Sequence, residues 1–179
     1  MTLCVRSASQ ISTIQGFARE TRKAESGEKM EKNIRKAAKN DAGRLAEIIV
    51  FNNRKNYYPI FRDIVYSFSE YTVANVTEQF LRDSEFMEHC YVYEDQVIKG
   101  FLCVADREIK KLYVDTFFQG EGIGTALLRY GVEELNADNL WALEKNENAL
   151  RFYRKLGFRC TNEKIYEEGT TEYLIHLVR

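Results

Sequence analysis

Residues 112–135 read LYVDTFFQGEGIGTALLRYGVEEL, and this stretch decides how the rest of the chain is interpreted. Apolar residues typical of a strand lead to an aromatic pair, to the glycines at 120, 122 and 124, and then to an amphipathic run. Glycine permits a positive φ and lets a ligand approach the backbone, while the first N–H groups of a helix are unpaired and partly positive. The stretch therefore predicts a strand, a turn and a helix whose start binds an anion such as phosphate.

Two common phosphate-binding patterns are absent from this turn. No lysine follows Gly124, as the P-loop pattern would require, and Thr125 occupies the position of the third glycine of a dinucleotide-binding GxGxxG. A turn that only packs a helix on a strand therefore remains an alternative to a phosphate site. In the phosphate site, the Thr125 hydroxyl would add a donor.

The composition of the chain is that of one ordinary globular domain. It has 179 residues, of which 45% are hydrophobic and 30% charged, with a net charge of -1. This charge gives no basis for binding nucleic acid or an anionic membrane surface. The sequence contains no apolar run long enough to span a membrane and does not begin like a secretory signal.

The cysteines and histidines give no metal-binding pattern. The two histidines, His89 and His176, are far apart, and no CxxC pair occurs. We expect no metal, and we expect reduced thiols in a cytoplasmic protein, with two of the cysteines buried in strands. The four cysteines are Cys4, Cys90, Cys103 and Cys160, of which Cys90 and Cys103 are the two expected in strands.

The sequence divides into an N-terminal extension and one compact domain. Residues 1–31 are highly charged and lack apolar periodicity, so they are either a loose or partly helical tail or an arm that packs on the domain or on a second subunit. The domain covers residues 32–179, and its order of elements predicts a mixed α+β fold. Strands are expected at 33–37, 89–106 (a hairpin turning at 94–96), 107–116, 139–144, 158–168 and 171–179. Helices are expected from 40 or 41, at 56–71 (kinked or lid-like), at 73–83, from the glycines to 135, and at 147–157.

Two motifs in this order resemble the GNAT superfamily of N-acetyltransferases. Residues 119–124, QGEGIG, match its Q/R-x-x-G-x-G/A signature, and residues 143–158, LEKNENALRFYRKLGF, match its N-x-x-A-x-x-F-Y-x-x-x-G-F segment. The resemblance covers roughly residues 32–179. It implies the GNAT fold, a central twisted sheet of about six or seven mixed, mostly antiparallel strands flanked by about four helices. Its edge strands would permit a homodimer.

The resemblance also implies acetyl-CoA as co-substrate and an N-acetyltransferase activity on a small-molecule or peptide amine, by direct attack in a ternary complex. The backbone of one strand would pair with the pantetheine arm, the glycine turn would hold the pyrophosphate, and an asparagine would lie near the thioester or cap the following helix. The cofactor-binding residues implied are Leu112, Tyr113, Val114, Gln119, Gly120, Glu121, Gly122, Ile123, Gly124, Thr125, Asn146 and Tyr153.

The chemistry requires a proton donor and a route for removing a proton. Deprotonating a lysine-like amine at pH 7 costs about 4.6 kcal/mol, and the leaving thiolate needs a hydrogen bond or a proton. The resemblance places Tyr153 beside the sulfur as the acid, although its spacing also fits a core aromatic. Glu108 is the candidate base, on a strand face predicted to include Lys110, Leu112 and Val114, with Glu144 as the competing carboxylate. Glu108 could equally be a solvated charge at a strand end.

The acceptor site is expected to involve residues 52–63, 67–71 and the last hairpin. The tyrosines of this region would line a pocket or simply pack a lid, and Glu70, Glu167 and Glu168 could attract a cationic amine. Cys103 has no histidine partner that would make it a nucleophile. A non-catalytic acyl-CoA-binding module that regulates a partner is the alternative function.

Overall fold

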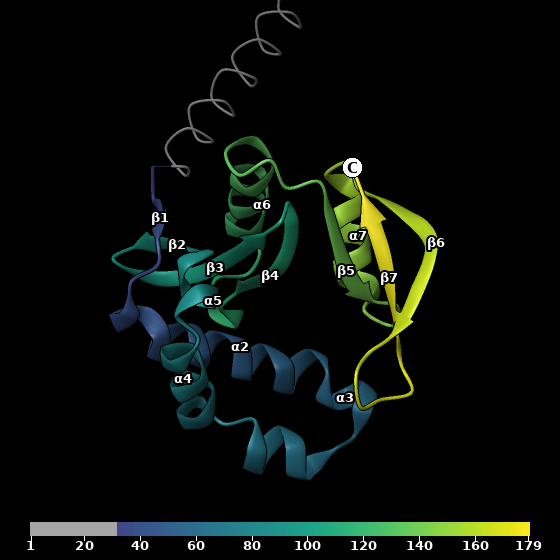
Figure 1. The fold of residues 1–179 in the computed structure, drawn as a ribbon, viewed down its shortest axis with the longest axis horizontal. Helices are drawn as coiled ribbons and strands as arrows, with labels where there is room; N and C mark the ends of the chain where they lie inside the picture. The colour runs from purple at the N-terminus through teal and green to yellow at the C-terminus, as the bar shows by residue number, and fades with distance from the viewer. Residues whose placement is uncertain (1–31) are drawn as a thin grey trace, which may run out of the picture.

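The computed structural model describes residues 32–179, which form one seven-stranded sheet in the order β1-β2-β3-β4-β5-β7-β6 (Figure 1). All neighbouring strands are antiparallel except β4 and β5, so the predicted mixed, mostly antiparallel sheet is confirmed. The predictions for residues 1–31 and for Cys4 lie outside the described residues. The strands are β1 Ile34–Lys36, β2 Cys90–Asp95, β3 Val97–Ala105, β4 Glu108–Val114, β5 Asn139–Leu143, β6 Arg159–Tyr166 and β7 Tyr173–Val178.

Four longer helices and two single turns of α-helix accompany the sheet within residues 32–179. The longer helices correspond to those expected from the apolar periodicity, and none of the helices is both long and apolar enough to cross a lipid bilayer. The helices are α2 Ala42–Asn56, α3 Tyr58–Phe61, α4 Val73–Arg82, α5 Ser84–Glu88, α6 Ile123–Glu133 and α7 Glu147–Lys155. Shorter segments are η1 Lys39–Asp41, the π-helical η2 Tyr66–Glu70 and η3 Thr116–Phe118.

Two clusters of buried side chains cover the two faces of the sheet. The first joins α2 and α4 to residues such as Val92 and Phe101, and the second joins α6 and α7 to Leu102 and Leu140. Phe101 and Leu102 are adjacent in β3 and point to opposite faces, as strand geometry requires. The sheet is therefore a middle layer between two helical layers.

Helix α2 buries the face that the sequence predicted. Leu45, Ile48 and Ile49 are all 1% exposed or less. Asp41 occupies the predicted N-cap position, but its carboxylate does not bond to the first turn of the helix. It accepts hydrogen bonds from the Arg35 guanidinium at 2.7 and 3.1 Å and from the Ala38 N–H at 2.8 Å, and the Arg35 bond holds the pKa of Asp41 below its usual range.

The segment predicted as a kinked helix or lid is broken into two short helices. Pro59 lies in the first turn of α3, where its missing N–H costs no helical bond. The break comes at Arg62, whose φ of 58° is left-handed and ends α3 before the π-helical turn η2 begins at Tyr66. The chain reverses at this break, and η2 lies beside α2.

The predicted hairpin is present, but the expectation for its cysteines is wrong. Strands β2 and β3 meet at Gln96, which has a φ of 63°. Cys90 and Cys103 are both in strands and buried, as predicted, but they form a disulfide instead of remaining thiols. The physical reason is the register, because these two residues face each other directly across the hairpin with their Cα atoms 4.1 Å apart. Cys160 is a free thiol.

Candidate active site

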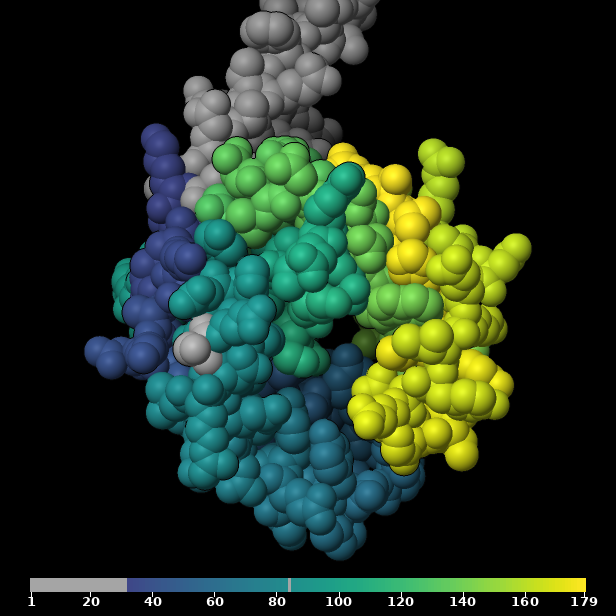
Figure 2. Space-filling model, in the orientation of Figure 1, coloured from purple at the N-terminus to yellow at the C-terminus, as the bar shows by residue number. Residues whose placement is uncertain are grey.

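Strands β4 and β5 separate soon after they begin. They pair only through Glu108 with Asn139 and Ile109 with Leu140, although β4 continues to Val114 and β5 to Leu143. The later part of β4 therefore has a neighbour on one side only. Figure 2 shows a hollow at the centre of this face, bordered by the dark blue of α2, the green end of β4 and the yellow β6–β7 hairpin.

The backbone groups of Leu112 and Val114 point into the gap between these strands. The Asp115 N–H donates to the Lys99 carbonyl at 2.8 Å, which fixes the side of β4 that faces β3. Backbone groups alternate between the two sides of a strand, so Tyr113 also bonds toward β3, whereas Leu112 and Val114 face away from it. An extended ligand could add to β4 here as a strand would.

The glycine turn at the end of this gap is open to solvent. Gly120 and Gly122 have φ values of 88° and 87° and are both exposed. Gly122 is the N-cap of α6, and its carbonyl accepts the first helical bond from Ala126 N–H at 3.0 Å. No side chain caps this helix, so the N–H groups of residues 123–125 lack helical acceptors. This geometry suits an anion.

Gly124 has a packing role as well. A β-carbon added there would lie 3.4 Å from Cζ of Phe152 and 3.6 Å from Cγ2 of Val114, whereas one added at Gly120 would meet nothing within 4 Å. The absence of a side chain at Gly124 therefore lets α6 lie close to β4 and α7. The packing interpretation therefore applies to Gly124, whereas the exposed turn before it leaves room for a ligand.

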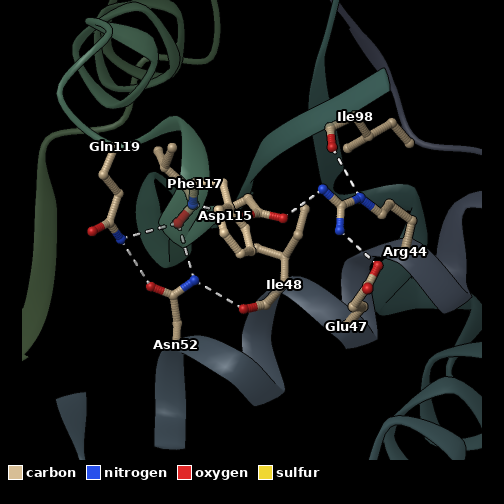
Figure 3. A network of polar contacts seen from close by, with 9 residues as sticks. Arg44, Glu47, Ile48, Asn52, Ile98, Asp115, Phe117 and Gln119 are labelled. Atoms are coloured by element: carbon tan, nitrogen blue, oxygen red, sulfur yellow. Dashed lines mark hydrogen bonds and ion pairs between the residues drawn. The ribbon is translucent and has the colours of Figure 1, made fainter. Parts of the chain in front are cut away.

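A hydrogen-bonded network joins α2 to the end of β4 and to the turn (Figure 3). The Asn52 Nδ2 atom donates to the carbonyls of Ile48 at 2.9 Å and Val114 at 3.0 Å. The Gln119 Nε2 atom donates to Asn52 Oδ1 and to the same Val114 carbonyl, both at 3.2 Å. The side chain of Gln119, predicted as a cofactor residue, therefore holds the turn in place from within the protein.

The Arg44 guanidinium forms the second half of this network. It donates to the Ile98 carbonyl at 3.0 Å, to Glu47 at 2.6 Å and to Asp115 at 2.5 Å. The other oxygen of the buried Asp115 carboxylate accepts the N–H of Phe117 at 2.9 Å, which caps η3. Helix α2 thus fixes both the strand end and the loop that leads to the glycines.

Tyr153 lies on α7 within an aromatic cluster. Its ring makes edge contacts with Phe152 and Phe158, with centroids 5.3 and 6.1 Å apart. Burial raises the pKa of Tyr153, and the proximity of Tyr57 raises it further. Its phenol therefore stays protonated through the neutral pH range and is available as a donor.

Tyr57 and Tyr113 bring the helical layer, the strand and Tyr153 together. Burial raises the pKa of Tyr57, while the nearby polar groups of Tyr113 and Asn146 oppose this rise. Burial also raises the pKa of Tyr113, with Tyr57, Tyr71 and Tyr153 contributing in the same direction. The structure thus groups three of the predicted residues, Tyr113, Asn146 and Tyr153, at the open end of β4.

Asn146 caps α7, as the sequence suggested. Its Oδ1 atom accepts the Ala149 N–H at 3.1 Å. The influence of Asn146 on the pKa of Tyr57 shows that this amide also faces the cluster. The capping role and a role beside a ligand are therefore compatible.

The predicted alternation along β4 is wrong because of a β-bulge. Cys103 pairs with Lys111 and Val104 with Ile109, which leaves Lys110 as an extra residue. Ile109, Leu112 and Val114 consequently share the face toward α6, while Tyr113 packs against the α2 cluster. By the same alternation, Lys111 faces the α2 side and Leu112 does not.

The two candidate bases are each paired with a lysine. Glu108 is at the paired end of β4, roughly 16 Å along the strand from Tyr113, and its carboxylate accepts from Lys110 Nζ at 2.6 Å. Glu144 accepts from Lys164 Nζ at 2.5 Å and is partly exposed. The role of Glu108 as a base stays a prediction, without support from this geometry.

Sequence reasoning missed Asn52, Asp115 and Lys111. A signal for Asn52 was present, because it lies one helical turn beyond Ile48 and Ile49 on the buried face of α2. A polar residue on such a face requires a partner. Lys111 carried no comparable signal, since its orientation depends on the bulge.

Comparisons with known proteins agree with this architecture. Residues 87–160 match the family described as "Acetyltransferase (GNAT) domain". An N-acetyltransferase of Staphylococcus aureus Mu50 is 17% identical, with a TM-score of 0.66 over 82% of this chain and 99% of that one. A GNAT superfamily phosphinothricin acetyltransferase of Sinorhizobium meliloti, solved with acetyl-CoA, is 19% identical, with a TM-score of 0.60 over 82% and 86%. At these sequence identities, the structural similarity shows only that the fold is shared.

One curated relative matches a shorter segment. An uncharacterized N-acetyltransferase of Methanocaldococcus jannaschii is 39% identical over 56 residues. The aligned segment is 28% of this chain and only 25% of the length of that relative. The match over residues 87–160 and the shared fold both agree with the resemblance that the two motifs carry.

Proposed function

We propose that this chain is an N-acetyltransferase that uses acetyl-CoA to acetylate a primary amine by direct attack in a ternary complex. The match of residues 87–160 to the GNAT acetyltransferase domain and the shared fold support this proposal. The observation that carries the proposal is the combination of an uncapped α6 N-terminus with an open stretch of β4 beside it. Neither feature would suit a turn whose only task was packing. Acetyl-CoA is the donor bound by the phosphinothricin acetyltransferase relative.

Each part of the coenzyme has matching groups in the chain. The N–H groups of residues 120–125 would hold the pyrophosphate. The Leu112 backbone and the Val114 N–H would pair with the pantetheine arm, since the Val114 carbonyl is already bonded to Asn52 and Gln119. Lys55 lies next to this site, since its Nζ atom donates to Gln119 Oε1 at 3.3 Å. The coenzyme supplies the acetyl group as a thioester.

Tyr153 is proposed to donate a hydrogen bond to the sulfur as the thiolate leaves. An ordinary tyrosine would transfer its proton to a thiolate at a cost of roughly 2 kcal/mol. Burial raises the pKa of Tyr153, so complete transfer costs more than this. Hydrogen-bond donation is therefore the proposed role, which stabilises the negative charge without requiring Tyr153 to ionise.

The prediction of a cytoplasmic location has lost its support from the cysteines. That expectation depended on free thiols, and Cys90 and Cys103 are joined. A cytoplasmic location is retained only as a proposal, to be tested by fractionation of cells that produce the protein.

The pyrophosphate assignment is tested by replacing Thr125 with glutamate. A carboxylate in the first turn of α6 interacts favourably with the helix dipole, so the fold should be retained or slightly stabilised. The same charge repels a diphosphate, so we expect the affinity for CoA, measured by calorimetry, to fall about 10-fold or more.

Thr125→Gln is the matched control, because it has nearly the same size without the charge. It should bind CoA almost as tightly as the original protein. Equal affinities for the glutamate and glutamine variants would remove the pyrophosphate from this turn. CoA binding without thiol release from any amine would favour the non-catalytic module.

A further inference from the structure

Two opposite charges, neither in an ion pair, come from β4 and the β6–β7 hairpin, which are two of the elements that border the hollow in Figure 2. Lys111 on β4 and Glu167 after β6 are each half-buried, and neither belongs to any of the ion pairs among residues 32–179. By contrast, Lys110 next to Lys111 pairs with Glu108, and Lys164 on β6 pairs with Glu144. Two half-buried charges without partners cost folding free energy, unless a ligand supplies the missing partners.

The β-bulge places Lys111 on the α2 side of the sheet. Because Lys110 is the extra residue, Lys111 lies on the face of β4 that Tyr113 shares, opposite the face of Leu112. Burial lowers the pKa of Lys111, and the Glu167 carboxylate acts in the opposite direction. The two side chains are therefore within electrostatic range of each other, although farther apart than the 4 Å of an ion pair.

The end of α2 and the segment η2 supply further polar groups. The Glu167 charge also raises the pKa values of Tyr57 and Tyr66, after burial as the main cause, which indicates that both phenols lie within electrostatic range of this carboxylate. The Asn53 Oδ1 atom is buried and has no hydrogen-bond partner within the described part of the chain. Phenol and ammonium groups donate hydrogen bonds, whereas Glu167 and Asn53 Oδ1 accept them.

We propose that the acceptor is an amine that also carries a carboxylate, as an amino acid does. Lys111 and the tyrosine hydroxyls would hold the carboxylate, and Glu167 with Asn53 Oδ1 would receive the ammonium group. This inference rests on the proposed acetyltransferase function. A polyamine is a poorer fit, because it would bring a second cation toward an unpaired lysine and leave that lysine without a partner.

The test compares amines that differ by a single carboxylate. Ornithine against putrescine and β-alanine against ethylamine are two such pairs, with thiol release from acetyl-CoA as the readout. We expect kcat/KM to favour the carboxylate-bearing member of at least one pair by about 10-fold or more, the range expected of a charged hydrogen bond.

Variants of Lys111 show whether this residue makes the distinction. Lys111→Met should reduce the preference within the pair by about 10- to 100-fold, and Lys111→Glu should reverse it in favour of putrescine. Lys110→Met is the control, since Lys110 is exposed and paired with Glu108, and it should leave the preference unchanged. Calorimetric CoA binding by each variant checks that its coenzyme site is intact.

The outcomes separate this inference from the proposed function. Thiol release at equal rates within both pairs, or a preference that Lys111→Met does not alter, would overturn the inference and leave the acetyltransferase standing. An absence of thiol release from all four amines and from a wider panel, with no CoA binding, would overturn both.

Discussion

Tyr153 illustrates how one residue serves both packing and chemistry. Its ring belongs to the core beside Phe152 and Phe158, which agrees with its spacing on the helix. Its hydroxyl lies near Tyr57 at the open end of β4. From the sequence alone, the core role and the catalytic role of Tyr153 were alternatives. Helical periodicity predicts the position of the ring but not the direction of the hydroxyl.

We predict that Tyr153→Phe lowers kcat by about 100-fold and leaves the affinity for acetyl-CoA nearly unchanged, because only the hydroxyl is lost. Since the pKa of Tyr153 is raised, its ionisation should not depress the rate anywhere below the usual tyrosine value of about 10. Steady-state rates between pH 6 and 10 check both statements.

Tyr130→Phe, on α6, removes a hydroxyl outside the proposed site and should retain full activity. An unchanged kcat in the Tyr153 variant, or a loss of activity centred well below pH 10 that disappears with its hydroxyl, would contradict the role given to this residue.

At the scale of elements, α2 does more than cover the sheet. Its residues Arg44 and Asn52 reach the loop after β4 and the carbonyl of Val114, so the helix sets the shape of the coenzyme turn. A helix on one face of the sheet is thereby coupled to a turn at the edge of the opposite layer.

We predict that Asn52→Ala destabilises the protein by about 2 kcal/mol, because it leaves the Val114 carbonyl and the Gln119 amide with fewer partners. It should also weaken CoA binding, since the turn loses its anchor. Urea unfolding and calorimetry measure the two effects.

Asn56→Ala is the companion variant on the same helix. Asn56 is exposed and makes only one long contact, at 3.5 Å to Asn52 Oδ1, so its loss should change the free energy of unfolding by less than about 0.5 kcal/mol. Similar effects from both variants would mean that the network contributes nothing specific.

Elements could be predicted from the sequence where the pattern is local. The prediction failed for features that depend on the register with a neighbouring strand. The strands, the four longer helices and the turn at Gly169 follow from periodicity and turn residues. The bulge at Lys110 and the Cys90–Cys103 bond depend on how β3 aligns with its neighbours, which no single strand records. The two motifs located the coenzyme turn, whereas the network behind it needed the folded chain.

The whole molecule consists of two parts of one sheet held together at a narrow junction. Only two residue pairs connect β4 to β5, while β1–β4 and β5–β7 each pair extensively. The second core cluster, formed by α6, α7 and both parts of the sheet, supplies the remaining contact. A coenzyme lying along β4 would fill the space that this junction leaves.

We predict that CoA at 100 times its Kd stabilises the protein by about 2.7 kcal/mol, as measured by thermal unfolding. Amide exchange should show where it binds. The amides of Leu112 and Val114 should exchange quickly without CoA and slowly with it, while Tyr113, which bonds toward β3, should be protected in both states.

Protection of all three amides in the free protein would show that the gap is closed. Protection elsewhere on addition of CoA, with Leu112 and Val114 unaffected, would place the coenzyme on another surface.

The parting of β4 and β5 also bears on self-association. Unpaired strand edges invite edge-to-edge aggregation, which proteins usually discourage with charges, prolines or a covering loop. Here the unpaired length lies between neighbouring strands of the same sheet, with helical layers above and below. Flanked in this way, the unpaired edge of β4 is less open to a second polypeptide than the outer edges of the sheet at β1 and β6.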